Sequence, residues 1–79
     1  MHSLSNSYSK GYANLGVIFS EEKEWNQAIA SLEMAVALNE RDAMSYFRLS
    51  GAHNMNGDCK SALDAARKST ELKLSLIHI

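Results

Sequence analysis

The side chains best able to carry out chemistry are few and scattered along the sequence. They are the single cysteine, Cys59, and the three histidines, His2, His53 and His78. No two of them have the spacing that a helix-borne metal site needs. Cys59 lies near an expected helix start, but no fixed base can be assigned to activate its thiol. We therefore expect no metal site, no cofactor and no catalysis, and His53 is more simply a packing residue.

Composition and charge exclude further classes of function. The 79 residues include 8 basic and 9 acidic side chains, for a net charge of −1, so we expect neither a nucleic-acid nor a membrane partner. No stretch approaches the roughly 20 apolar residues that span a bilayer. A single cysteine rules out a disulfide within the chain and favours a reducing compartment such as the cytoplasm. Residues 1–9 do not resemble a secretory signal.

Apolar residues recur at helical spacing in four segments, and the absence of proline also favours helix. The segments are 9 to about 21–23, 25–38, 43–55 and 59–72. This pattern predicts an all-α fold of four helices of roughly 12–15 residues, preceded by a frayed or disordered tail over residues 1–8. The short turns between the segments require neighbouring helices to pack antiparallel.

Individual residues mark the expected helix boundaries. Asp42 and Asp58 are each placed to accept a backbone hydrogen bond at the start of a helix. Gly57 fits a left-handed C-terminal cap, a conformation that only glycine adopts without steric cost. The first turn has Lys23 and Glu24 instead of a glycine.

A spacing of 34 residues relates the two halves of the chain. Tyr12, Leu15, Gly16 and Ala28 are followed 34 positions later by Tyr46, Leu49, Ser50 and Ala62. A repeat of this length indicates one small unit stacked on a copy of itself. Small residues such as Gly16 and Ala28 let paired helices approach closely, whereas the large Tyr12, Phe19 and Tyr46 are expected to fill the gap between units. A stacked array offers an extended surface and no deep reaction cleft.

These residues resemble the tetratricopeptide repeat, in which each 34-residue unit is a pair of antiparallel helices. The matching residues are Tyr12, Leu15, Gly16, Phe19, Ala28, Leu32 and Ala35 in the first unit, and Tyr46, Leu49, Ser50, His53, Ala62, Ala66 and Ser69 in the second. The second unit departs from the family pattern at His53 and Ser69. The resemblance implies a right-handed α-solenoid fragment with repeat 1 at residues 9–42 and repeat 2 at residues 43–73.

The last six residues, 74–79, are abruptly apolar after a polar helix end. Their sequence is similar to a peptide made by translating sequencing-adapter DNA. On that interpretation the tail is not native and further repeats are missing from the chain. The alternative is a genuine apolar helix end that covers the last unit.

The resemblance also implies a peptide-binding groove on the concave face, which the first helix of each unit lines. The family's groove positions correspond to Lys10, Asn14, Val17 and Glu21 in unit one and to Met44, Phe47, Arg48, Asn54 and Met55 in unit two. Each set recurs at helical spacing and so lies on one stripe. Arg48 is suited to hold a carboxylate through two parallel hydrogen bonds. Alternatively, the methionines and Phe47 are core or neighbour-unit contacts and Arg48 is a solvated charge.

The function that the resemblance implies is a non-catalytic module that binds a peptide or protein partner. Because two units make a short groove, we expect further repeats or self-association to complete it. One alternative is a regulatory or spacer segment of a larger enzyme or sensor protein. A DNA-binding helix-turn-helix would need a basic recognition helix, and the third segment carries Arg48 alone. A purely structural array piece that binds nothing is the remaining alternative.

Overall fold

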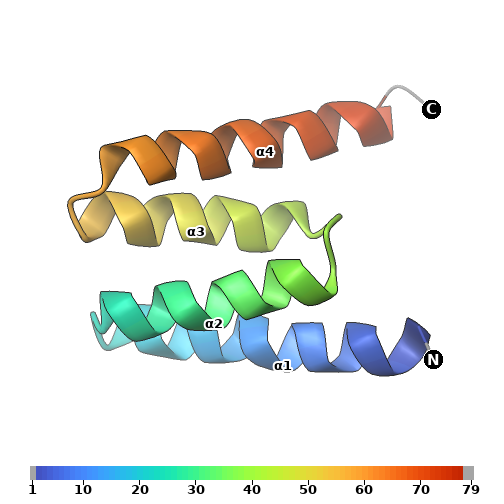
Figure 1. Ribbon diagram of the computed structural model, residues 1–79, viewed down its shortest axis with the longest axis horizontal. Coiled ribbons are helices and arrows are strands. Elements are labelled where there is room, and N and C mark those ends of the chain that lie inside the picture. Colours follow the sequence, from blue (N-terminus) through green and yellow to red (C-terminus); the bar gives the residue numbers. More distant parts are fainter. Residues whose placement is uncertain (1, 78–79) are drawn as a thin grey trace.

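A computed structural model describes the backbone of residues 2–77 and the side chains of residues 7–74. The chain forms four helices: α1 (His2–Glu21), α2 (Trp25–Leu38), α3 (Ala43–Met55) and α4 (Cys59–Ile77). Successive helices run antiparallel (Figure 1), and no strand occurs within residues 2–77. The all-α fold expected from the apolar spacing is therefore confirmed.

Two helices are longer than the sequence pattern predicts. The 14 residues of α2 and 13 of α3 agree with expectation, but α1 has 20 residues and α4 has 19. Residues 2–8, expected to form a frayed tail, are the start of α1, and residues 74–77 continue α4; positions 1, 78 and 79 lie outside the described backbone. Apolar spacing locates the part of a helix that is buried, and it does not specify where an exposed end stops.

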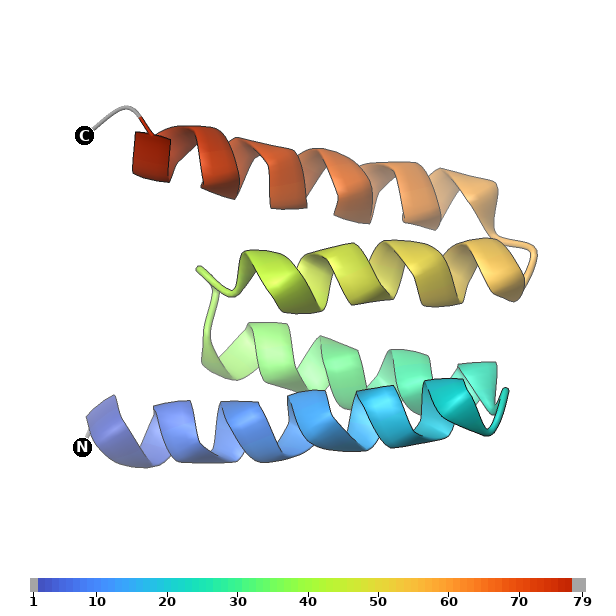
Figure 2. The same cartoon turned by 180° about the vertical axis from the view of Figure 1, so that it is seen from behind.

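The four helices form two hairpins, α1–α2 and α3–α4, that lie side by side in a slab of 35 × 26 × 16 Å. The α2 helix packs against both α1 and α3, whereas α1 meets α3 over only a short stretch. Figure 2, seen from behind, shows the α1–α2 and α3–α4 turns at the same end of the slab. At that end the Asn56 side-chain amide donates a hydrogen bond of 3.0 Å to Oδ1 of Asn26, which joins the two turns.

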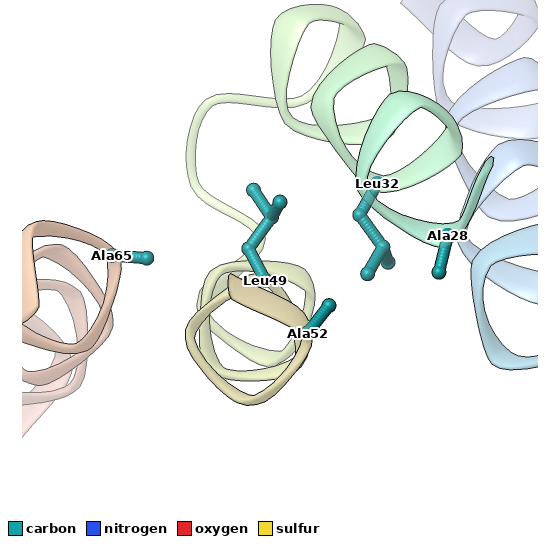
Figure 3. Close-up of a cluster of buried hydrophobic side chains, with 5 residues drawn as sticks. All are labelled: Ala28, Leu32, Leu49, Ala52 and Ala65. Atoms are coloured by element: carbon teal, nitrogen blue, oxygen red, sulfur yellow. The ribbon is translucent and has the colours of Figure 1, made fainter. Parts of the chain in front are cut away.

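The core lies between α2, α3 and α4, and small residues dominate it. Ala28 and Leu32 of α2 face Leu49 and Ala52 of α3, and Ala65 of α4 completes the cluster (Figure 3). Both Ala28 and Leu32 are fully buried. The partly buried side chains around the cluster are Phe19, Trp25, Ile29, Val36 and Tyr46.

Gly16 allows α1 to pack closely on α2. A Cβ atom at this position would lie 2.5 Å from Cγ and 2.6 Å from Cδ2 of Leu32, far inside van der Waals contact. Because Leu32 is fully buried, it has no space into which to retreat. The expected role of Gly16 as a small residue between paired helices is therefore confirmed.

Tyr12 does not lie where the repeat pattern predicts. Phe19 and Tyr46 pack against the core cluster, as expected for rings that fill the gap between hairpins. Tyr12 instead lines a shallow hollow of about 320 Å³ formed by residues of α1 alone, together with Tyr8 and Leu15. The reason is that, within the described residues, α1 packs mainly on α2 and no further hairpin lies against its other side.

A serine hydroxyl joins the two helices of each hairpin at the same level. In the first hairpin, Ser9 Oγ of α1 donates to the Ala35 carbonyl oxygen of α2 at 2.9 Å. In the second, Ser69 Oγ of α4 donates to the Ala43 carbonyl oxygen of α3, also at 2.9 Å. Positions 9 and 43 are 34 residues apart, and so are positions 35 and 69. The two hairpins are thus bridged at equivalent positions. The serine lies on the first helix of the first hairpin and on the second helix of the second hairpin.

The two turns are built differently. In the second turn Gly57 has φ +86°, and the Asp58 carboxylate accepts a 3.1 Å hydrogen bond from the Ser61 backbone N–H. Asp42 caps α3 in the same way through the Ser45 N–H. All three expected boundary roles are confirmed. In the first turn the non-glycine Lys23 takes the left-handed conformation, with φ +62°.

Candidate functional site

A small hollow lies between the end of α1, the start of α2 and α3. We call it the α1–α3 hollow; its lining residues are Ser20, Trp25, Arg48, Gly51, Ala52 and Met55. Its volume is about 240 Å³. A space of this size admits a single side chain of a ligand, and it is too small for a whole peptide or a cofactor.

The helices place three functional groups around this hollow. Trp25 begins α2 directly after the first turn and is half-buried, because part of its ring packs on the core cluster. Arg48 and Met55 are seven residues apart on α3, a spacing that puts both on one face of a helix. Ser20 Oγ already donates a 2.8 Å hydrogen bond to the Gly16 carbonyl oxygen. The indole, the thioether and the guanidinium therefore remain for a ligand.

These groups can make apolar and charged contacts. Trp25 and Met55 provide an apolar contact, and the Met55 side chain is 60% exposed. Arg48 is exposed and is the one charged side chain among the described residues that line the hollow. A guanidinium at the edge of an apolar site suits a ligand that carries a carboxylate beside an apolar group.

A second and larger depression runs along α3 and α4. We call it the α3–α4 groove; its lining residues are Phe47, Arg48, Ser50, Gly51, Asn54, Cys59, Ala62, Leu63 and Ala66. Its volume is about 430 Å³. Leu63 and Phe47 form its apolar rim and are 59% and 58% exposed. Arg48 borders both this groove and the α1–α3 hollow.

The structure brings together only some of the nine residues that the sequence assigns to a peptide groove. Arg48 and Met55 line the α1–α3 hollow, and Phe47, Arg48 and Asn54 line the α3–α4 groove. The predicted residues that line neither depression are Lys10, Asn14, Val17, Glu21 and Met44. Within this set Val17 is half-buried and the others are exposed.

The exposure of Met44, Phe47 and Met55 rules out the alternative that these side chains belong to the core. They are 55%, 58% and 60% exposed. One side of the Phe47 ring is occupied by the Lys73 ammonium, whose Nζ lies 5.6 Å from the ring centroid. This distance is that of a cation–π contact between α3 and α4.

Sequence reasoning missed Trp25 as a site residue. Its apolar ring at the start of a helix predicts a core residue, and the ring does pack partly on the core. Its second role arises because the start of α2 lies beside the end of α3, where Asn26 and Asn56 are hydrogen-bonded. No local pattern carries that information, since the two segments are 30 residues apart.

The ionisable residues do not form a metal site in the described part of the chain. No group of three or more His, Cys, Asp or Glu side chains there is placed to hold an ion. His53 is half-buried, and its Nδ1 is buried without a hydrogen-bond partner among the described residues. The Ser61 backbone N–H, followed by its hydroxyl, lowers the pKa of Asp58 below its ordinary value of 3.8.

The comparisons with known proteins assign no family. No protein-family model matches the chain, and no curated protein is similar enough to count as a match. None of the described helices is long and apolar enough to cross a bilayer.

Proposed function

We propose that the two hairpins are successive units of a right-handed helical solenoid of the tetratricopeptide type. Three equivalences at a spacing of 34 residues support this interpretation. Ala28 and Ala62 are both buried on the second helix of their hairpin. The serine bridges between paired helices occupy the same level in both hairpins. The turns of the two hairpins lie together at one end of the slab.

We further propose that the chain is a non-catalytic module that binds a peptide or a peptide segment of a protein. An apolar side chain of the ligand enters the α1–α3 hollow, and a neighbouring carboxylate pairs with Arg48. The observation that carries the proposal is the joint placement of Trp25, Arg48 and Met55 around one small hollow. Apolar lining with one well-placed polar group is typical of ligand sites in general.

Trp25 makes the proposal directly testable. It is the single tryptophan of the chain, so intrinsic fluorescence reports events at the hollow. Peptides selected from a random display library on the 79-residue chain are expected to pair an apolar residue with an Asp, a Glu or a free C-terminus. Their binding is expected to shift the Trp25 emission, because a ligand side chain displaces water from the ring.

Matched substitutions separate site binding from general adhesion. Arg48→Ala and Met55→Ala each remove a lining group and are expected to weaken binding, the former by roughly tenfold or more because a charge-assisted hydrogen bond is lost. Arg67→Ala and Met34→Ala remove exposed residues of the same types outside the hollow and are expected to change nothing. Selected peptides that bind both site variants as tightly as the unchanged chain would remove the proposed function.

A further inference from the structure

The α3–α4 groove is the unoccupied counterpart of a surface that is covered in the first hairpin. The groove residues from α4 are Cys59, Ala62, Leu63 and Ala66. The residues 34 positions earlier are Trp25, Ala28, Ile29 and Leu32, and all four belong to the core cluster or pack against it. In the first hairpin this surface is covered by α3. In the second hairpin the same positions line an open groove.

The α1 helix carries a counterpart of the α3 face that packs on the first hairpin. The α3 helix covers the first hairpin with Leu49 and Ala52, which are 4% and 2% exposed. The residues 34 positions earlier are Leu15 and Ile18 of α1, which are 43% and 48% exposed. Tyr46 packs beside the cluster, and its counterpart Tyr12 lines a hollow on α1 alone.

We propose that the chain self-associates head to tail through these two surfaces. The face of α1 formed by Tyr12, Leu15 and Ile18 in one copy occupies the α3–α4 groove of a second copy. Within one molecule, α3 packs on the first hairpin. The proposed contact between two molecules repeats this packing, with α1 of one copy in the place of α3. Because the two surfaces are different, the association is heterologous, and each added copy leaves one groove and one α1 face free.

The properties of both surfaces fit a second copy as the occupant. The groove has an apolar rim, with Leu63 59% exposed, and its floor includes the small Ala62, as the covered surface of the first hairpin has Ala28. The α1 face presents Leu15 and Ile18, which are 43% and 48% exposed, beside the half-buried Tyr12. Removing both surfaces from water is favourable at roughly 25 cal/mol per Å² of apolar area. The inference rests on the 34-residue equivalence and does not depend on peptide binding.

Sedimentation equilibrium of the 79-residue chain tests the proposal. The expected result is a weight-average mass that rises with concentration beyond that of a dimer. Ile18→Asp disables the α1 face, and Leu63→Asp disables the groove. Each variant alone is expected to weaken self-association by at least about tenfold, since an unpaired charge would be buried in an apolar contact. Met34→Asp introduces the same charge at a residue that is 44% exposed and lies outside both surfaces, and it should leave association unchanged.

A mixture of the two defective variants provides the decisive result. Ile18→Asp retains an intact groove and Leu63→Asp retains an intact α1 face, so the mixture is expected to form one-to-one dimers that grow no further. Helicity by circular dichroism should match the unchanged chain, because Ile18 and Leu63 are 48% and 59% exposed and lie outside the core cluster. Met55→Ala, a change in the α1–α3 hollow, should leave the mass distribution unchanged. A monomer at all concentrations, or dimers that the mixture fails to restore, would overturn the proposal.

The thiol of Cys59 offers an independent measurement. Cys59 is exposed, lines the groove and is the counterpart of Trp25 in the first hairpin. Its alkylation rate is expected to fall as the concentration of the unchanged chain rises, and to stay constant for Ile18→Asp. An alkylation rate that does not depend on concentration in the unchanged chain would contradict coverage of the groove.

Discussion

The first and second hairpins bury equivalent residues to different extents. Leu15 and Leu49 are 34 positions apart, yet Leu15 is 43% exposed and Leu49 is 4% exposed. Ile29 is half-buried against the core, whereas its counterpart Leu63 is 59% exposed. In each pair the buried residue is the one that faces the other hairpin. Burial in this fold therefore depends on the neighbour that covers a position.

The turns of the two hairpins also differ, and here the local signals are stronger in the second hairpin. The second hairpin has strong local signals, with Gly57 in the left-handed region and Asp58 as a capping residue. The first hairpin places Lys23 in that region, and Glu24 at the start of α2 makes no side-chain capping bond within the described part of the chain. The first hairpin thus lacks the local turn signals of the second, while Gly16 lets its two helices approach closely.

Shortening a covered leucine should lower the free energy of unfolding far more than shortening an uncovered one. Leu49→Ala is expected to lower the free energy of unfolding by about 2–5 kcal/mol, because it leaves a cavity in the core. Leu15→Ala makes the same change at the equivalent exposed position and should cost under about 1 kcal/mol. Urea unfolding at low protein concentration, where self-association contributes little, measures both values. Equal losses of unfolding free energy in the two variants would contradict the difference in burial between Leu49 and Leu15.

The next effect concerns close packing within the first hairpin. Gly16→Ala would drive a methyl group into the buried Leu32, and we expect it to destabilise the fold by about 1–3 kcal/mol. Gly51→Ala is the matched control, since a Cβ there meets nothing within 4 Å among the described residues. That variant should stabilise the fold by about 0.5–1 kcal/mol through helix propensity alone. Thermal unfolding compares the two, and a stabilising Gly16→Ala would refute the close fit of α1 on α2.

Introducing glycine in the first turn should stabilise the fold, and removing glycine from the second turn should destabilise it. Lys23→Gly relieves the steric cost of a left-handed backbone and is expected to raise the free energy of unfolding by about 0.5–1 kcal/mol. Gly57→Ala imposes that cost on the second turn and should lower the free energy by roughly 1 kcal/mol. Chemical unfolding of the two variants measures both changes. A neutral Lys23→Gly would mean that the first turn carries no strain.

The smallest of these effects is the pH dependence of folding stability that arises from Asp58 in the second turn. The pKa of Asp58 is lowered in the folded chain, so its stabilising contribution is present above the unfolded value of 3.8 and is lost as pH falls through the folded pKa. Asp58→Asn keeps a capping side chain but cannot titrate. The variant should lose less stability than the unchanged chain between about pH 6 and about pH 3. Asp64→Asn, which removes an exposed carboxylate in α4, is the control; an unaltered acid response in Asp58→Asn would disprove the assignment.

The sequence was sufficient to predict the helical fold, the pairing of helices, and the roles of Gly16, Asp42, Gly57 and Asp58. These features depend on local spacing and on the conformations that single residues allow. The sequence did not reveal that Tyr12, which is half-buried, lines a hollow on α1 alone and does not pack between the hairpins. It also missed Trp25 at the α1–α3 hollow, which forms where two turns distant in the chain meet. The start of α1 was missed because serines and Asn6 surround the helically spaced Leu4 and Tyr8, and these residue types favour turns over helix.

The second hairpin lies against the first in the same orientation, with turn beside turn. A nitroxide spin label on Cys59 tests it most directly, since this exposed thiol is the single cysteine of the chain and follows the second turn. The Ile18→Asp background keeps the labelled chain monomeric. This arrangement predicts strong paramagnetic broadening of the backbone amide signals around Asn26, at the start of α2 beside the first turn, and sharp signals around Asn39 at the opposite end. Sharp signals around Asn26, or broadening that centres on Asn39, would contradict it.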